Sequence, residues 1–153
     1  MYRRYAQKTS VSVDKSLSEI KRTLDRYGAN SFMYGTKDIL AVIRFEMNGK
    51  RVRFDLPLPS PEQFRKNRHG RRIIEERAMK NHEQACRQSF RALALAVKAK
   101  LEAVEAKITS FEEEFMAHIE LPNGSTVGKW MVPQIEAAYS SKKMPPLLEG
   151  AKN

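Results

Sequence analysis

The chain has 153 residues, and 28 Lys and Arg residues against 18 Asp and Glu residues give a formal net charge of +10. This length fits one domain with a real hydrophobic core, while concentrated positive charge favours an anionic partner such as nucleic acid. The single cysteine excludes an internal disulfide and fits a reducing cytoplasm, and no apolar run approaches the roughly 20 residues of a membrane span.

The N-terminal part of the chain is predicted to be a short arm followed by a helix. Residues 1–14 are mostly polar and form the arm. Asp14 is placed to cap a helix over about residues 15–27, and Gly28 stands where a glycine commonly ends a helix. The apolar residues of this helix recur at helical spacing and predict its buried face: Leu17, Ile20, Leu24 and Tyr27.

A β-hairpin is predicted between Ala41 and Leu56. Asn48 and Gly49 are the strongest short-range hairpin signal, because both residues tolerate the positive φ of a type I′ turn. With these residues at the turn, one face of the hairpin is wholly apolar and the other is polar. The apolar pairs are Phe45 with Val52, Ile43 with Phe54 and Ala41 with Leu56, and the polar-face pairs are Glu46 with Arg51, Arg44 with Arg53 and Val42 with Asp55.

The Arg44/Arg53 pair requires an explanation, because like charges directly opposite each other destabilise a sheet. Two explanations are open. The nearby carboxylates Glu46 and Asp55 compensate the two guanidinium groups, or an anionic ligand does. From the sequence alone, replacing both arginines with alanine is expected to leave stability unchanged or slightly improved.

A strand over Phe32 to Tyr34 is predicted to extend this hairpin to a three-stranded antiparallel meander. A turn over residues 35–38 pairs Tyr34 with Ile39 and Phe32 with Ala41, so both aromatic residues join the apolar face. The sheet ends near Pro57, since proline cannot donate a ladder hydrogen bond.

A basic linker and a long helix follow. Residues 60–70 carry Pro61 and Gly70 with several cations, a composition typical of a solvated or disordered loop. The helix buries one continuous seam, which we expect to pack on the sheet of the same chain rather than on a second copy. Its start is open, because residues 71–85 permit a helix but are poorly patterned. The seam consists of Phe90, Ala94, Val97, Leu101, Val104 and Ile108.

The C-terminal region is predicted to add two helices and a tail. Ser110 and Glu113 match a capping box, so a short helix starts at Phe111. After a turn over residues 121–124, Thr126 caps a last helical stretch, in which Pro133 must introduce a kink or a restart. This stretch contains Trp130, Ile135 and Tyr139, and residues 140–153 form the tail.

The sequence gives almost no support for catalysis, a cofactor or a metal. No glycine-rich phosphate loop is present, and the histidines His69, His82 and His118 lack metal-ligand spacing. Cys86 lies one helical turn after His82, but its position on the seam marks it as a core residue. The acidic run at residues 112–114 is expected from the helix dipole. We therefore expect a protein that is not an enzyme.

Positive charge is concentrated between Arg44 and Arg91, where 13 basic residues face six acidic ones. Cations that neutralise phosphates release counterions and give salt-dependent affinity for nucleic acid. No aromatic residue lies on the polar hairpin face, so a base-stacking platform is absent there. The predicted phosphate contacts are Arg44, Arg51, Arg53, Arg65, Lys66, Arg68, Arg71, Arg72, Arg87 and Arg91.

Three segments resemble a family of uncharacterised proteins from bacteriophages and prophages. They read ITSFEEEFMAHI at residues 108–119, LPNGSTVGKWMVPQIEAAY at 121–139 and MPPLL at 144–148. Residues 32–58 and 90–101 are also similar. The resemblance implies a phage origin, and therefore the cytoplasm of a bacterial host, but no activity or site residues. The order of helix, meander and long basic helix also resembles the core of Rad52-like single-strand annealing proteins, without a shared motif.

These observations predict an α+β fold, with a small antiparallel β-meander packed on a long helix and additional N- and C-terminal helices. Residues 15–139 form the single domain. The predicted function is non-enzymatic nucleic-acid binding, with DNA as the expected partner, in phage replication or recombination. Single-stranded DNA binding or annealing is one such role, and a homo-oligomer is expected. The alternative is a phage protein that binds and inhibits a host complex in defence or transcription.

Overall fold

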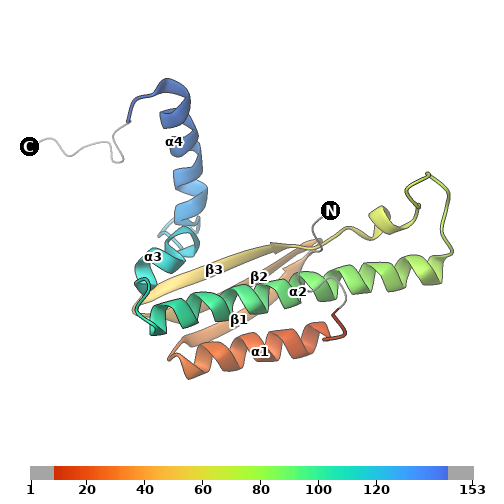
Figure 1. Ribbon diagram of the computed structural model, residues 1–153, viewed down its shortest axis with the longest axis horizontal. Coiled ribbons are helices and arrows are strands. Elements are labelled where there is room, and N and C mark those ends of the chain that lie inside the picture. Colours follow the sequence, from red (N-terminus) through yellow and green to blue (C-terminus); the bar gives the residue numbers. More distant parts are fainter. Residues whose placement is uncertain (1–8, 145–153) are drawn as a thin grey trace, which may run out of the picture.

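The computed structural model describes residues 9–144 and confirms the α+β fold (Figure 1). A three-stranded antiparallel sheet of order β1-β2-β3 is combined with helices on one side and at the C-terminal end. The elements are α1 (Val13–Arg26), β1 (Asn30–Lys37), β2 (Leu40–Met47), β3 (Lys50–Pro57), η1 (Pro61–Phe64), α2 (Glu75–Glu105), α3 (Phe111–Phe115), η2 (Met116–His118) and α4 (Val127–Ser141).

The β2-β3 hairpin has the predicted register in full. Asn48 and Gly49 form the turn with φ angles of 51° and 70°, the positive values that a type I′ turn needs. All six predicted pairs between the strands are present, including Arg44 opposite Arg53. Residues of the apolar face are buried, since Ile43 and Phe45 are each only 1% exposed.

The predicted pairing of the first strand is wrong by four residues. Tyr34 pairs with Ile43 instead of Ile39, and the two residues between the strands are Asp38 and Ile39. Gly35 suggested an early turn, but it lies inside β1, while Asp38 takes the positive φ of 53°. A shift by an even number keeps each side chain on its face. Tyr34 therefore still lies on the helix side, with its ring edge-to-face on Phe90.

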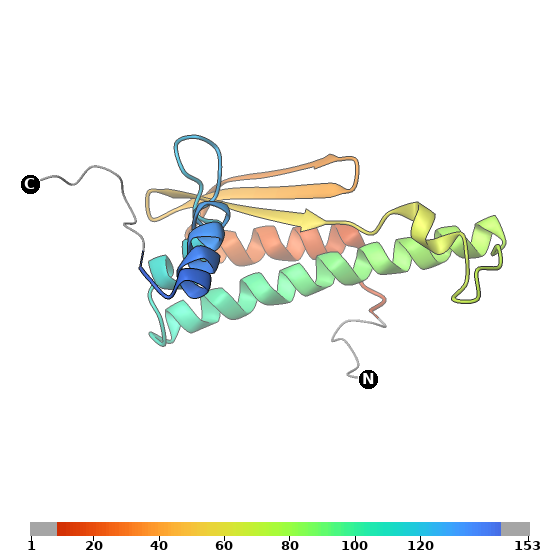
Figure 2. The ribbon, with the colours of Figure 1, turned by 90° about the horizontal axis from the view of Figure 1, so that it is seen from above.

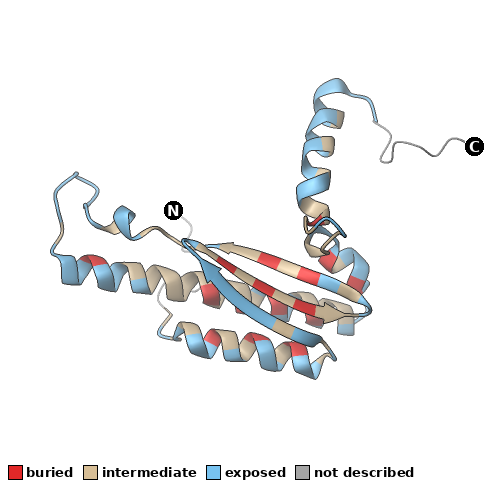
Figure 3. Ribbon diagram, turned by 180° about the vertical axis from the view of Figure 1, so that it is seen from behind, coloured by how far each residue is buried: buried red, intermediate tan, exposed pale blue. Residues whose placement is uncertain are grey.

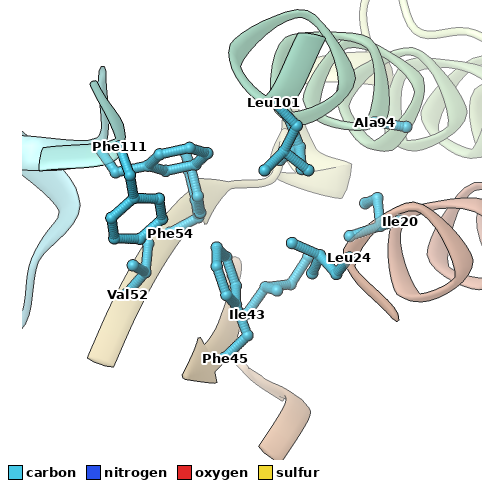
Figure 4. Close-up of a cluster of buried hydrophobic side chains, with 11 residues drawn as sticks. Ile20, Leu24, Ile43, Phe45, Val52, Phe54, Ala94, Leu101 and Phe111 are labelled. Carbon is cyan, nitrogen blue, oxygen red and sulfur yellow. The ribbon is translucent and has the colours of Figure 1, made fainter. Parts of the chain in front are cut away.

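Helices α1 and α2 lie side by side across the apolar face of the sheet, as Figure 2 shows from above. Figure 4 shows their apolar side chains meeting those of the strands, with Ile20, Leu24 and Leu101 directed toward Ile43 and Phe45. Leu24 and Leu101 are fully buried at 0% exposure. The seam of the long helix therefore packs on its own sheet, as predicted, and β1 is the exposed outer strand (Figure 3).

Several predicted helix ends are corrected. Ser12 caps α1 in place of Asp14, because its Oγ accepts a hydrogen bond from the backbone N–H of Lys15. The long helix begins at Glu75 and ends at Glu105. The chain then reverses at Lys107, whose φ is 59°, so Ile108 leaves the predicted seam and is 80% exposed.

The C-terminal helices begin where predicted. Ser110 and Glu113 form the capping box of α3, and Thr126 caps α4. Helix α4 continues through Pro133 to Ser141, so of the two predicted effects of this proline, a kink or a restart, the restart is absent. This helix contacts the domain through η2 and projects away from it (Figure 1). None of its residues is buried.

The predicted arm and tail lie largely outside residues 9–144. Within the described residues, α1 begins at Val13 and α4 ends at Ser141, so each helix extends two residues beyond the predicted domain bounds. No helix between residues 9 and 144 combines the length and the apolar character that a membrane span requires.

Candidate nucleic-acid interface

Residues 65–72, here called the basic loop, form a narrow hairpin between η1 and α2. An isolated β-bridge joins Lys66 to Arg72, and the N–H of Ile73 donates to the carbonyl oxygen of Arg65 at 2.9 Å. The sequence suggested a solvated or disordered linker here. The backbone hydrogen bonds give this segment a hairpin shape, and its side chains are exposed to solvent as expected.

The tip of the basic loop is held by Asn67. Its side-chain Oδ1 accepts hydrogen bonds from the N–H groups of His69 at 2.9 Å and Arg71 at 3.0 Å. Its backbone N–H donates to the carbonyl of Arg71, and its carbonyl accepts from Gly70, which has a φ of 76°. Sequence reasoning missed this role, although asparagine followed closely by glycine is a known turn signal.

Five cations and no carboxylate lie in the basic loop, and all five are exposed. Arg65 forms an ion pair with Glu62 at 3.1 Å, with both side chains more than half exposed. The other four have no ion-pair partner among residues 9–144. The five residues are Arg65, Lys66, Arg68, Arg71 and Arg72. Among the predicted phosphate contacts, those in the basic loop other than Arg65 therefore form the densest group of cations without ion-pair partners in the described part of the chain.

The structure separates the basic loop from the hairpin arginines. Figures 1 and 2 show the loop beyond one end of the sheet, beside the start of α2, whereas the β2-β3 turn lies at the opposite end. Arg51 follows this turn by two residues. The ten predicted contacts therefore do not form one continuous surface.

Glu120 neutralises two of the hairpin arginines. The Nε of Arg44 donates to its carboxylate at 2.9 Å, and Arg51 approaches the other oxygen at 3.4 Å. Arg51 also lies 3.5 Å from Glu46. The Glu120 side chain is only 9% exposed, because the chain segment that carries it lies against β3: its N–H donates to the carbonyl of Arg51. The sequence analysis did not identify Glu120.

Asp55 compensates Arg53, as one of the two sequence explanations proposed. The Nε of Arg53 donates to Asp55 at 2.6 Å, and Lys129 of α4 reaches the second carboxylate oxygen at 2.6 Å. Burial of Asp55 opposes ionisation, but the hydrogen bonds from Lys129 and Arg53 outweigh it, so the pKa of this carboxyl group lies below its usual value. The repulsion between Arg44 and Arg53 is thus relieved within the protein.

The two predicted contacts on the α2 flank also have partners inside the protein. Both Nε and a terminal nitrogen of Arg87 donate to the side-chain oxygen of Gln84, at 3.0 and 2.7 Å. Arg91 forms an ion pair with Glu19 and so links α2 to α1. These side chains are half-buried and hold the helix surface together.

The Cys86 and His82 side chains lie within hydrogen-bond distance of each other on α2. Nε2 of His82 lies 2.9 Å from the carbonyl oxygen of Pro59 and 3.6 Å from the sulfur of Cys86. Burial, and then the charge of Glu83, raise the pKa of the Cys86 thiol, which disfavours the reactive thiolate. Within residues 9–144, no group of three or more His, Cys, Asp or Glu residues is arranged to hold a metal ion.

No protein-family model, curated protein or solved structure matches this chain. The resemblances to phage proteins and to single-strand annealing proteins therefore stay predictions.

Proposed function

We propose that this protein is a non-enzymatic nucleic-acid-binding protein of phage origin, and that the basic loop is its primary phosphate contact. The observation that carries this proposal is the set of exposed loop cations, four of which have no ion-pair partner among residues 9–144. We expect DNA to be bound in phage replication or recombination, in the cytoplasm of a bacterial host.

The shape of the basic loop supports this proposal. A flexible loop loses conformational entropy when it binds, and the hydrogen bonds that Asn67 accepts from His69 and Arg71 reduce this cost by bracing the loop before binding. The loop also lies at an end of the molecule, where a polyanion reaches it without passing the sheet (Figure 2). Arg44, Arg51, Arg53, Arg87 and Arg91 are secondary contacts in this proposal, because each has a partner within the protein.

The test is the salt dependence of DNA binding. In Arg68→Gln/Arg71→Gln, the slope of log affinity against log salt should decrease by about 0.7–0.9 for each phosphate group that is no longer neutralised. Fluorescence anisotropy with labelled random single- and double-stranded DNA measures this slope. The matched control is Arg22→Gln/Lys98→Gln, which removes the same charge from exposed sites on α1 and α2. Equal decreases in both variants would reject the basic loop as the interface.

The alternative function, inhibition of a host protein complex, is supported by one observation. Helix α4 exposes large apolar side chains, including Val132 at 50% and Tyr139 at 82%. Large exposed apolar surfaces commonly mark protein-protein contacts. This alternative predicts weak DNA affinity at physiological salt and a slope that the loop variant does not change.

A further inference from the structure

A pocket of about 400 Å³ lies at the base of the basic loop, between η1 and the first turns of α2. Part of its wall is apolar and is formed by Ile73, Ala78 and Met79. Ala78 is 7% exposed, whereas Met79 is 58% exposed. The volume falls in the usual range of small-molecule sites, about 300–1,000 Å³.

Charges of both signs line the same pocket. Arg65 and Arg72 come from the two ends of the basic loop, and Glu75 and Glu83 come from α2. Among residues 9–144, neither Arg72 nor either of the two glutamates has an ion-pair partner within 4.0 Å. The pocket therefore offers cations, carboxylate acceptors and an apolar wall that are not already used by one another.

We propose that this pocket takes one unstacked nucleotide whose base carries an exocyclic amino group. The planar base lies against Met79 and Ile73, since a methionine thioether packs favourably on aromatic rings. Arg72 and Arg65 neutralise the phosphate of this nucleotide. The carboxylate of Glu75 or of Glu83 accepts a hydrogen bond from the amino group, the contact by which carboxylates recognise cytosine.

The same arrangement selects against thymine. Thymine has a carbonyl oxygen at the position where cytosine carries its amino group, so a carboxylate placed to accept from that amino group meets another acceptor. Base-paired nucleotides are also excluded, because a base must leave the stack to enter a pocket, and this costs least in a single strand. The inference rests on the proposed function, since the strand reaches the pocket along the basic loop.

The experiment compares affinities for dC12, dA12 and dT12 at one salt concentration. We expect the wild-type protein to bind dC12 and dA12 about tenfold more tightly than dT12, within the discrimination that one base-edge contact gives. In Glu75→Gln/Glu83→Gln the ratio should fall close to one while the salt slope stays unchanged. The control Glu76→Gln/Glu105→Gln removes the same charge from exposed sites that do not line the pocket, and should keep the ratio.

The outcomes separate this inference from the proposed function. In Arg68→Gln/Arg71→Gln, affinity for all three oligonucleotides should fall together while the preference over dT12 remains. Loop-dependent binding without a preference over dT12 would overturn the pocket but not the function. Absence of loop-dependent binding would overturn both.

A second arm distinguishes a strand from a free nucleotide. Titration with deoxycytidine monophosphate, followed by the NMR signal of the Met79 methyl group, should shift this signal at concentrations at least a hundredfold above those needed for dC12. Equal affinity for the mononucleotide and dC12 would overturn the assignment to a strand.

Discussion

Glu120 is the residue on which the polar face of the hairpin depends, and it changes the expected effect of the Arg44/Arg53 pair. Its side chain is 9% exposed and bonded to Arg44, so removal of Arg44 leaves a buried carboxylate without its strongest donor. In the structure Asp55 also depends on Arg53. From these contacts we expect stability to decrease when the like-charge pair is removed, whereas the sequence alone led us to expect unchanged or slightly improved stability.

The first prediction is that Arg44→Ala/Arg53→Ala lowers the free energy of unfolding by about 1–3 kcal/mol, the cost of losing hydrogen bonds to the carboxylates of Glu120 and Asp55. Urea unfolding followed by circular dichroism measures it. Arg51→Ala is the matched control, because this side chain is 52% exposed and its ion pairs should contribute less than about 1 kcal/mol. An unchanged or higher free energy of unfolding in the double variant would show that the bonds of Arg44 to Glu120 and of Arg53 to Asp55 do not stabilise the fold.

His118 gives the second prediction, which concerns pH. Its ring is stacked on Phe54 at 4.1 Å, and burial, reinforced by the nearby Lys100, lowers its pKa. The unfolded chain, with a histidine pKa of about 6.5, then binds more protons, so the stability due to His118 is full above that pH and is lost as the pH falls below it. The depressed carboxyl pKa of Asp55 acts only at much lower pH.

We therefore expect the wild-type protein to unfold at a lower urea concentration at pH 5.5 than at pH 8. In His118→Leu this difference should shrink, whatever the change in absolute stability at pH 8. If the difference in unfolding between pH 5.5 and pH 8 is equally large in the variant, the pH dependence of stability is due to groups other than His118.

The seam of α2 was predicted from the sequence except at its last residue, Ile108. Leu101 lies mid-seam at 0% exposure against the sheet and α1, so Leu101→Ala should cost about 2–5 kcal/mol. Ile108→Ala is a matched control from the same predicted seam, since Ile108 is 80% exposed and the change should stay within about 0.5 kcal/mol. Thermal and urea unfolding compare the two variants, and a cost below about 0.5 kcal/mol for Leu101→Ala would contradict the observed packing.

Helices and strands were predictable from the sequence where one buried face makes apolar residues recur at a regular spacing. The middle of α2 lies on the sheet, so its apolar residues recur regularly, whereas its first turns project past the sheet and bury only Ala78. For this reason the sequence did not determine where α2 begins. The candidate site was likewise predictable only in part. The cations of the basic loop follow one another in the sequence, whereas Glu120 bonds to Arg44, 76 residues away, and no local sequence pattern indicates this contact.

At the scale of the whole molecule, charge and apolar surface lie at different places. The basic loop occupies one end, and α4 projects from the region near η2 (Figure 1). The sequence predicted an oligomer because the apolar faces of two helices needed cover. The first of these, α1, is covered by α2 and the sheet, since Ile20 and Leu24 are buried. The second, α4, contacts η2 but has no fully buried residue, and Trp130, Ile135 and Tyr139 are exposed.

The last prediction is that a homo-oligomer forms through α4. Ile135 is 46% and Tyr139 82% exposed, and residues four apart share one side of a helix, so a second copy would bury both. We expect the mass from light scattering to exceed that of a monomer at micromolar concentration, and the melting temperature to rise with concentration.

Ile135→Ser/Tyr139→Ser should give a monomer whose melting temperature no longer depends on concentration, while Ile108→Ser, an exposed apolar site outside α4, should leave the assembly intact. A wild-type monomer at all concentrations would reject the oligomer. Since the apolar side of α4 would then stay exposed in solution, that result would favour the host-protein alternative over a self-assembling DNA-binding protein.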